Sequence, residues 1–170
     1  MSTFHRSTKV ATVAALALGM SIGLATTPAH AAPYLSMSSH INFHPVAGTL
    51  TSGGYFDQWV IDINGVVAMS ETAASDAINH GYTIALRYWG DDPDSDDLLY
   101  GPVNPRTVFA AGDGLHFQHY VTLPHFLLDE DSGVVDLPYG RDEIYVGSRL
   151  LDPSGKTVSL VESNRYVDKL

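Results

Sequence analysis

The most regular feature of this chain is an alternation of apolar and polar residues at every second position, which is typical of a β-strand with one buried face. Four longer segments alternate in this way: 58–63, which leads through Asn64-Gly65 into the apolar run 66–69, and 82–89, 115–123 and 144–150. Three shorter apolar stretches are predicted to be strands as well: 41–50, 98–100 and 158–160. Pro45 would confine the first of these to a sheet edge or a bulge. The pattern therefore predicts about seven strands.

Two turns are predicted to join neighbouring strands as hairpins. Asn64-Gly65 follows Ile63 and precedes another apolar run, and this dipeptide is the one most typical of a two-residue hairpin turn. We therefore expect 58–69 to fold back on itself. Asp152-Pro153-Ser154-Gly155 predicts a type I turn with a left-handed glycine, which leads into the strand at 158–160.

One short helix is predicted between Ser70 and Gly81. Ser70 can cap its first turn, Glu71 suits its positive end, and Gly81 can end it after about ten residues. Short strands with tight turns and a single crossover helix favour an all-β fold. We expect an antiparallel β-sandwich, C2-like or immunoglobulin-like, because a parallel sheet would need alternating helices.

The first 31 residues have the pattern of a secretory signal peptide. Arg6 and Lys9 precede an apolar run over 10–25, and the small-residue motif Ala29-His30-Ala31 ends the segment. The apolar run is shorter than the roughly 20 residues that a membrane span needs. We therefore expect cleavage after Ala31 and a secreted, extracytoplasmic product without an integral membrane span.

The predicted mature chain has 170 − 31 = 139 residues, a length typical of one domain. We expect a flexible N-terminal arm at 32–39 and a single β-sandwich domain at 40–170. Its formal charge is 7 − 19 = −12, because the signal peptide holds two of the nine basic residues and no acidic residue. This charge disfavours nucleic acid as a partner. The chain has no cysteine, so its stability depends on core burial, a metal or assembly.

An acidic loop between two predicted strands is the sharpest chemical feature. Five carboxylates fall within seven residues: Asp91, Asp92, Asp94, Asp96 and Asp97. Calcium takes six to eight oxygen ligands, and alternate residues of a tight loop can turn their carboxylates toward one centre. Asp129 and Asp131 belong to a second acidic cluster that would complete the site if the two loops converge. The alternative is a solvated, charged turn that prevents strands from pairing with neighbouring molecules.

The segment 84–101 resembles the calcium loop of C2 domains in part. A strand leads into the acidic loop, followed by Asp96-Asp97-Leu98-Leu99 and then Gly101. Trp89 stands where that family places the first aspartate of its Asp-x-Asp pair. The resemblance implies a sandwich with loop-bound calcium, and it implies nothing about phospholipids.

The histidines form no recognised zinc motif. His116 and His119 are three residues apart on a predicted strand, so their side chains should point to opposite faces. His119 stands in an apolar row and is expected to be a hydrogen-bonded core residue. His40 and His44 are four apart and could share a strand face.

Three classes of function fit these observations. The first is a secreted, non-catalytic binding or structural module, stabilised by calcium through the Asp-rich loop. The second is an extracytoplasmic hydrolase of a glycan or envelope polymer, which would need two carboxylates and could use Trp89, Tyr88 and Tyr100 as a sugar platform. The third is an acidic protein that binds a basic partner protein.

Overall fold

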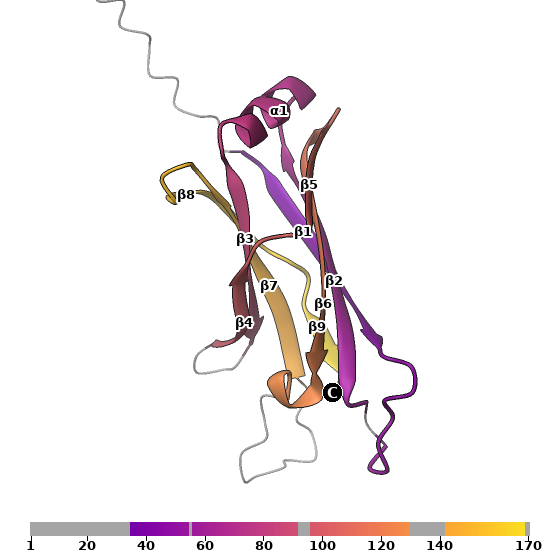
Figure 1. Ribbon diagram of the computed structural model, residues 1–170. Coiled ribbons are helices and arrows are strands. Elements are labelled where there is room, and N and C mark those ends of the chain that lie inside the picture. Colours follow the sequence, from indigo (N-terminus) through magenta and orange to yellow (C-terminus); the bar gives the residue numbers. More distant parts are fainter. Residues whose placement is uncertain (1–34, 55, 92–95, 130–141, 169–170) are drawn as a thin grey trace, which may run out of the picture. The chain divides into compact units, whose positions relative to one another are not determined.

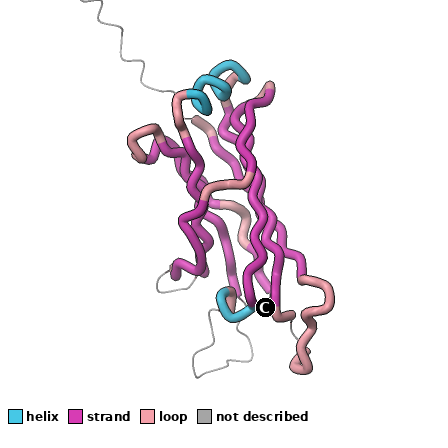
Figure 2. Tube along the Cα trace, in the orientation of Figure 1, coloured by secondary structure: helices cyan, strands magenta, loops and turns pink. Residues whose placement is uncertain are grey.

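The protein is an antiparallel β-sandwich of two sheets. The computed structural model describes residues 35–54, 56–91, 96–129 and 142–168. The four-stranded sheet has the order β1 (Met37–Pro45), β2 (Gln58–Ala68), β6 (Gly114–Pro124), β5 (Thr107–Ala111). The five-stranded sheet has the order β4 (Asp97–Val103), β3 (Thr83–Gly90), β7 (Asp142–Leu151), β8 (Thr157–Glu162), with β9 (Tyr166–Asp168) also paired to β7. Figure 1 labels these strands, and Figure 2 shows that strands make up most of the described chain. The predicted all-β fold is confirmed.

The core lies between the two sheets and is built by the alternation seen in the sequence. Ile61, Ile63 and Phe117 come from one sheet, and each is at most 1% exposed. Leu86 and Val146 come from the other sheet and are fully buried. Each strand therefore contributes every second residue to a shared apolar layer, which is the main source of stability in a chain without disulfides.

The predicted helix forms and connects the two sheets. α1 (Glu71–Asn79) follows β2 and precedes β3. The Ser70 hydroxyl accepts a hydrogen bond from the amide of Ala73 at 3.2 Å, so it caps the helix as expected. Gly81 adopts a φ of 84°, a left-handed conformation that glycine adopts without strain. A 3-10 turn, η1 (His125–Leu127), follows β6.

The prediction of a hairpin at Asn64-Gly65 is wrong. β2 continues through both residues, and Gly65 pairs with Ser39 on one side and Phe117 on the other. A Cβ at position 65 would lie 2.2 Å from Cζ of Phe117 and 2.5 Å from the carbonyl oxygen of Ser38. Glycine is therefore required here for close packing inside a central strand, and pairing on both sides outweighs the local preference for a turn.

Other strand boundaries also differ from the predictions. The described residues form nine strands rather than about seven, and the unpredicted β5 and β9 are short strands without a long apolar alternation. β1 begins at Met37, so the last three residues of the predicted arm belong to a strand. The hairpin at 152–155 forms as predicted. The Asp152 carboxylate accepts hydrogen bonds from the amides of Ser154 and Lys156, both at 2.9 Å, and Gly155 has a φ of 83°.

The outer edge of β1 is contacted by side chains from β8 and from the connection that follows it. Asn164 lies in the connection between β8 and β9, and its amide nitrogen donates to the carbonyl of Ile41 at 3.2 Å. The Ile41 amide donates to the Asn164 side-chain oxygen at 2.8 Å. Ser159 of β8 donates to the carbonyl of Leu35 at 3.1 Å. These bonds satisfy backbone groups that an edge strand otherwise leaves open.

The described residues, with all nine described strands, belong to one compact unit. The predicted signal peptide lies outside the described residues. Within the described ranges, no helix has the length and apolar character needed to cross a membrane.

Candidate functional site

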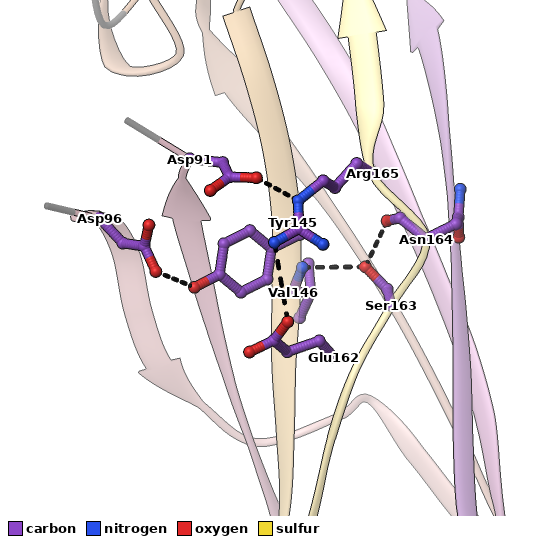
Figure 3. A network of polar contacts seen from close by, with 8 residues as sticks. All are labelled: Asp91, Asp96, Tyr145, Val146, Glu162, Ser163, Asn164 and Arg165. Atoms are coloured by element: carbon purple, nitrogen blue, oxygen red, sulfur yellow. Dashed lines mark hydrogen bonds and ion pairs between the residues drawn. The ribbon is translucent and has the colours of Figure 1, made fainter. Parts of the chain in front are cut away.

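The two ends of the acidic loop are tied to the neighbouring strand β7 and to the C-terminal segment (Figure 3). Nε of Arg165 donates to the carboxylate of Asp91, and Nη2 of Arg165 lies 3.8 Å from the carboxylate of Glu162. The Tyr145 hydroxyl donates to Asp96 at 2.6 Å. The Arg165 guanidinium also lies over the Tyr145 ring, 4.9 Å from its centroid. We call these five residues the loop clasp.

Electrostatics in the loop clasp favour these donors. Burial and the hydrogen bond to Asp96 raise the pKa of Tyr145 well above its ordinary value. The phenol therefore stays protonated and donates a hydrogen bond to Asp96. The hydrogen bond to Asp91 raises the pKa of Arg165. The protein therefore supplies a donor to Asp91 and another to Asp96.

The structure describes four of the seven predicted calcium ligands. Asp91 and Asp96 belong to the loop clasp, Asp97 is exposed at the start of β4, and Asp129 follows η1. Asp92, Asp94 and Asp131 lie outside the described residues. Among the residues that are described, no group of three or more histidine or acidic side chains could hold a metal ion. Calcium binding by the acidic loop stays a prediction.

His116 and His119 face opposite sides of β6, as expected from strand geometry. His116 stacks on Phe109 with ring centroids 5.1 Å apart, and its Nε2 lies 2.6 Å from the carboxylate of Asp113. His119 stands in the inward row with both ring nitrogens buried and, within the described chain, no hydrogen-bond partner. The expected hydrogen bond of His119 is therefore not found there. Burial lowers the pKa of His119, and the nearby charge of Arg106 lowers it further.

The sugar platform considered at Trp89, Tyr88 and Tyr100 does not form as one surface. Tyr88 is fully buried and packs against Tyr100 with ring centroids 5.6 Å apart. Burial raises the pKa of the Tyr88 hydroxyl. Trp89 points to the opposite side of β3, beside Gly147, where a Cβ would lie 3.2 Å from the indole nitrogen. Two of the three aromatic residues therefore serve the core.

A more promising surface is the outward face of the four-stranded sheet, which sequence reasoning missed. Strand register aligns its side chains in rows across β1, β2 and β6. One row is His40, Asn64 and Gln118, and the next is Asn42, Asp62 and Tyr120. A third row is Ser38, Val66 and His116, extended to Phe109 of β5. We call these residues, with His44, Thr107 and Arg106, the polar face.

Two shallow hollows lie side by side on the polar face. The first has a volume of about 350 Å³ and is lined by residues that include Ser38, His40 and His116. The second has a volume of about 370 Å³ and is lined by residues that include Asp62, Arg106 and Tyr120. Asn64 and Gln118 line both hollows. The hollows therefore form adjoining parts of one surface, bordered by groups that can donate and accept hydrogen bonds.

Arg106 holds Tyr120 in place on this surface. The guanidinium carbon lies 3.9 Å from the centroid of the Tyr120 ring. Nε of Arg106 donates to the Tyr120 carbonyl at 3.1 Å, and Nη1 lies 3.2 Å from the Tyr120 hydroxyl. Tyr120 is nevertheless 51% exposed. An aromatic ring with a fixed orientation is thus available for contact beside the second hollow.

Comparisons with known proteins add little to this description. No family model matches the chain, and no curated protein matches it. A solved structure that resembles it is a β-glucosidase from Kluyveromyces marxianus, with 11% sequence identity and a TM-score of 0.32. The match covers 81% of this chain and 16% of the glucosidase chain. A likeness this low carries no argument about the fold or the activity.

Proposed function

We propose that this protein is an exported, non-catalytic module that binds a glycan through the polar face. The observation that carries the proposal is the Tyr120 ring, held by Arg106 in one row with Asn42 and Asp62. Signal-peptide cleavage after Ala31 would place the module outside the cell, where glycans of envelopes and matrices are abundant.

The chemistry of sugars matches this arrangement. A pyranose ring has apolar C–H groups on its faces and hydroxyl groups around its edge. An exposed, oriented aromatic ring can pack against the C–H groups, as Tyr120 could. Amide and carboxylate side chains can pair with hydroxyls, and Asn64 and Gln118 stand between the two hollows. The proposed ligand is therefore a short stretch of polysaccharide.

The same surface favours binding over hydrolysis. Glycoside hydrolysis ordinarily needs two carboxyl groups, one on each side of the scissile bond. Asp62 is the one carboxylate among the residues that line the two hollows. A hydrolase acting at the polar face would lack its second carboxyl group, so we propose a binding role without catalysis.

Titration of the purified protein with soluble polysaccharides tests this function. We expect saturable binding, monitored by calorimetry or by NMR shifts of polar-face residues. Tyr120→Ala should weaken binding by about tenfold, equivalent to about 1.4 kcal/mol. Phe126→Ala is a matched control, because Phe126 is 73% exposed and lies in η1, away from the polar face. Equal losses in both variants, or no binding by the parent protein, would overturn the proposal.

A further inference from the structure

The polar face carries a charge unlike that of the chain as a whole. The predicted mature chain has a net charge of 7 − 19 = −12. Three of the chain's eight histidines, His40, His44 and His116, are on the polar face together with Arg106. Among the described strands of this sheet, Asp62 is the one carboxylate at an outward position, and Asp113 lies in the turn before β6. The polar face is therefore close to neutral, with one guanidinium and three imidazoles, on a chain that is strongly acidic overall.

We infer that the polar face selects an anionic polysaccharide, one that bears carboxylate or sulfate groups. This inference rests on the proposed glycan-binding function and concerns the same two hollows. It adds the charge of the ligand, which neither the Tyr120 ring nor the amide side chains determine.

Arg106 provides the permanent positive charge. A guanidinium has five N–H donors in a planar fork, and the two bonds to Tyr120 use two of them. Because the guanidinium stacks on the ring, its plane is oriented before a ligand arrives. An anionic group on a sugar packed against Tyr120 could therefore reach a donor of Arg106 with a charge-assisted hydrogen bond.

Three histidines add ring nitrogens that can donate hydrogen bonds on the same surface. His40 stands at the wall of the first hollow, in the row of Asn64 and Gln118. His44 lies 3.4 Å from the carboxylate of Asp62, and His116 lies 2.6 Å from that of Asp113. Among the side chains that the structure describes, His40 is left without a carboxylate partner of this kind, and its ring N–H can donate a hydrogen bond to an anionic group in the first hollow.

Along the direction of β1, the polar face is long enough to contact several sugar units. From Ser38 to Asn42 the strand advances four residues, or about 13 Å at the usual rise. This length passes both hollows, from the side of His116 to the side of Tyr120. Charged groups spaced along a polysaccharide can therefore meet His40 beside the first hollow and Arg106 beside the second at the same time.

The test compares three polysaccharides with the purified protein: polygalacturonate, which carries carboxylates; dextran sulfate; and neutral dextran. Affinities are measured by calorimetry at low and at high ionic strength. We expect at least one anionic polymer to bind about tenfold more tightly than dextran at low ionic strength. We expect this advantage to shrink at high ionic strength, because salt screens the attraction between charges. Binding of polygalacturonate identifies carboxylate as the recognised group, and binding of dextran sulfate identifies sulfate.

Two variants show whether the polar face is responsible for the preference for anionic polymers. His40→Gln combined with His44→Gln should weaken binding of the anionic polymer, and Arg106→Gln should reduce the preference for that polymer over dextran. His80→Gln is the matched control, because His80 is exposed at the end of α1. If dextran binds as well as the anionic polymers, the charge inference fails and the glycan proposal stands. Absence of binding to all three overturns both, and anionic binding that ignores these variants overturns the inference.

Discussion

Asn164 and Ile41, 123 positions apart in the chain, exchange two hydrogen bonds through the side chain of one and the backbone of the other. The Asn164 amide thereby acts as a short piece of β-strand against β1. This pairing joins the two sheets along the edge that borders β1.

Replacing Asn164 should therefore destabilise the sandwich. Asn164→Leu leaves the amide and the carbonyl of Ile41 without these partners, and we expect a loss of about 1–3 kcal/mol in the free energy of unfolding. Urea denaturation measures it. Asn79→Ala, at the exposed end of α1, should change stability by less than about 0.5 kcal/mol. Equal effects would show that the bonds to Ile41 contribute nothing specific.

Gly65 should not tolerate a side chain. Gly65→Ala places a Cβ 2.2 Å from Phe117 and 2.5 Å from the backbone of Ser38, and we expect a loss of about 1–3 kcal/mol or more. Gly112→Ala is the matched control, because nothing lies within 4 Å of a Cβ at that position. Adding Phe117→Leu to Gly65→Ala should restore part of the loss, since it removes one of the two clashes. Thermal denaturation of the four proteins would contradict this account if Gly65→Ala melted like the parent.

His119 should make the protein less stable in acid. Its pKa in the folded state is lowered below the ordinary value of 6.5, so the unfolded chain binds a proton more readily. The free energy of unfolding is then highest above about pH 6.5 and falls as the pH drops through the folded-state pKa. His119→Leu should flatten this dependence between pH 8 and pH 5, measured by urea denaturation. His80→Gln should leave it in place, and an unchanged slope in His119→Leu would refute the assignment.

Calcium should raise the melting temperature if the acidic loop holds it. We expect a higher melting temperature in millimolar calcium than in chelator, because a ligand bound by the native state alone stabilises that state. Asp92→Asn with Asp94→Asn should abolish the difference while leaving the loop clasp intact. Identical melts of the parent protein with and without calcium would remove this proposal.

Local signals in the sequence predicted much of the fold. The long alternating strands, the cap at Ser70 and the Asp152–Gly155 turn all depend on neighbours a few residues away. The hairpin prediction at Asn64-Gly65 failed because the partners of this dipeptide are strands distant in sequence. A turn preference of two residues cannot compete with pairing along both sides of an eleven-residue strand.

The candidate site was harder to predict because it depends on register. His40, Asn64 and Gln118 form one row only after three separate strands have paired. A signal was present, since polar residues alternate at 38, 40, 42 and 44 and again at 116, 118, 120 and 122. The apolar residues of each alternating strand predicted the core, and the polar residues of the same strands form the surface. The partner of Asp91 could not be inferred, because Arg165 is 74 residues away.

The loop clasp has a consequence for protein engineering. Asp91 and Asp96 are each held by a side chain outside the segment that they enclose, Arg165 for one and Tyr145 for the other. Neither bond involves a side chain between Asp91 and Asp96. We therefore expect that a foreign peptide inserted between these two residues leaves both bonds and the sandwich intact, which would make this protein a cysteine-free display scaffold.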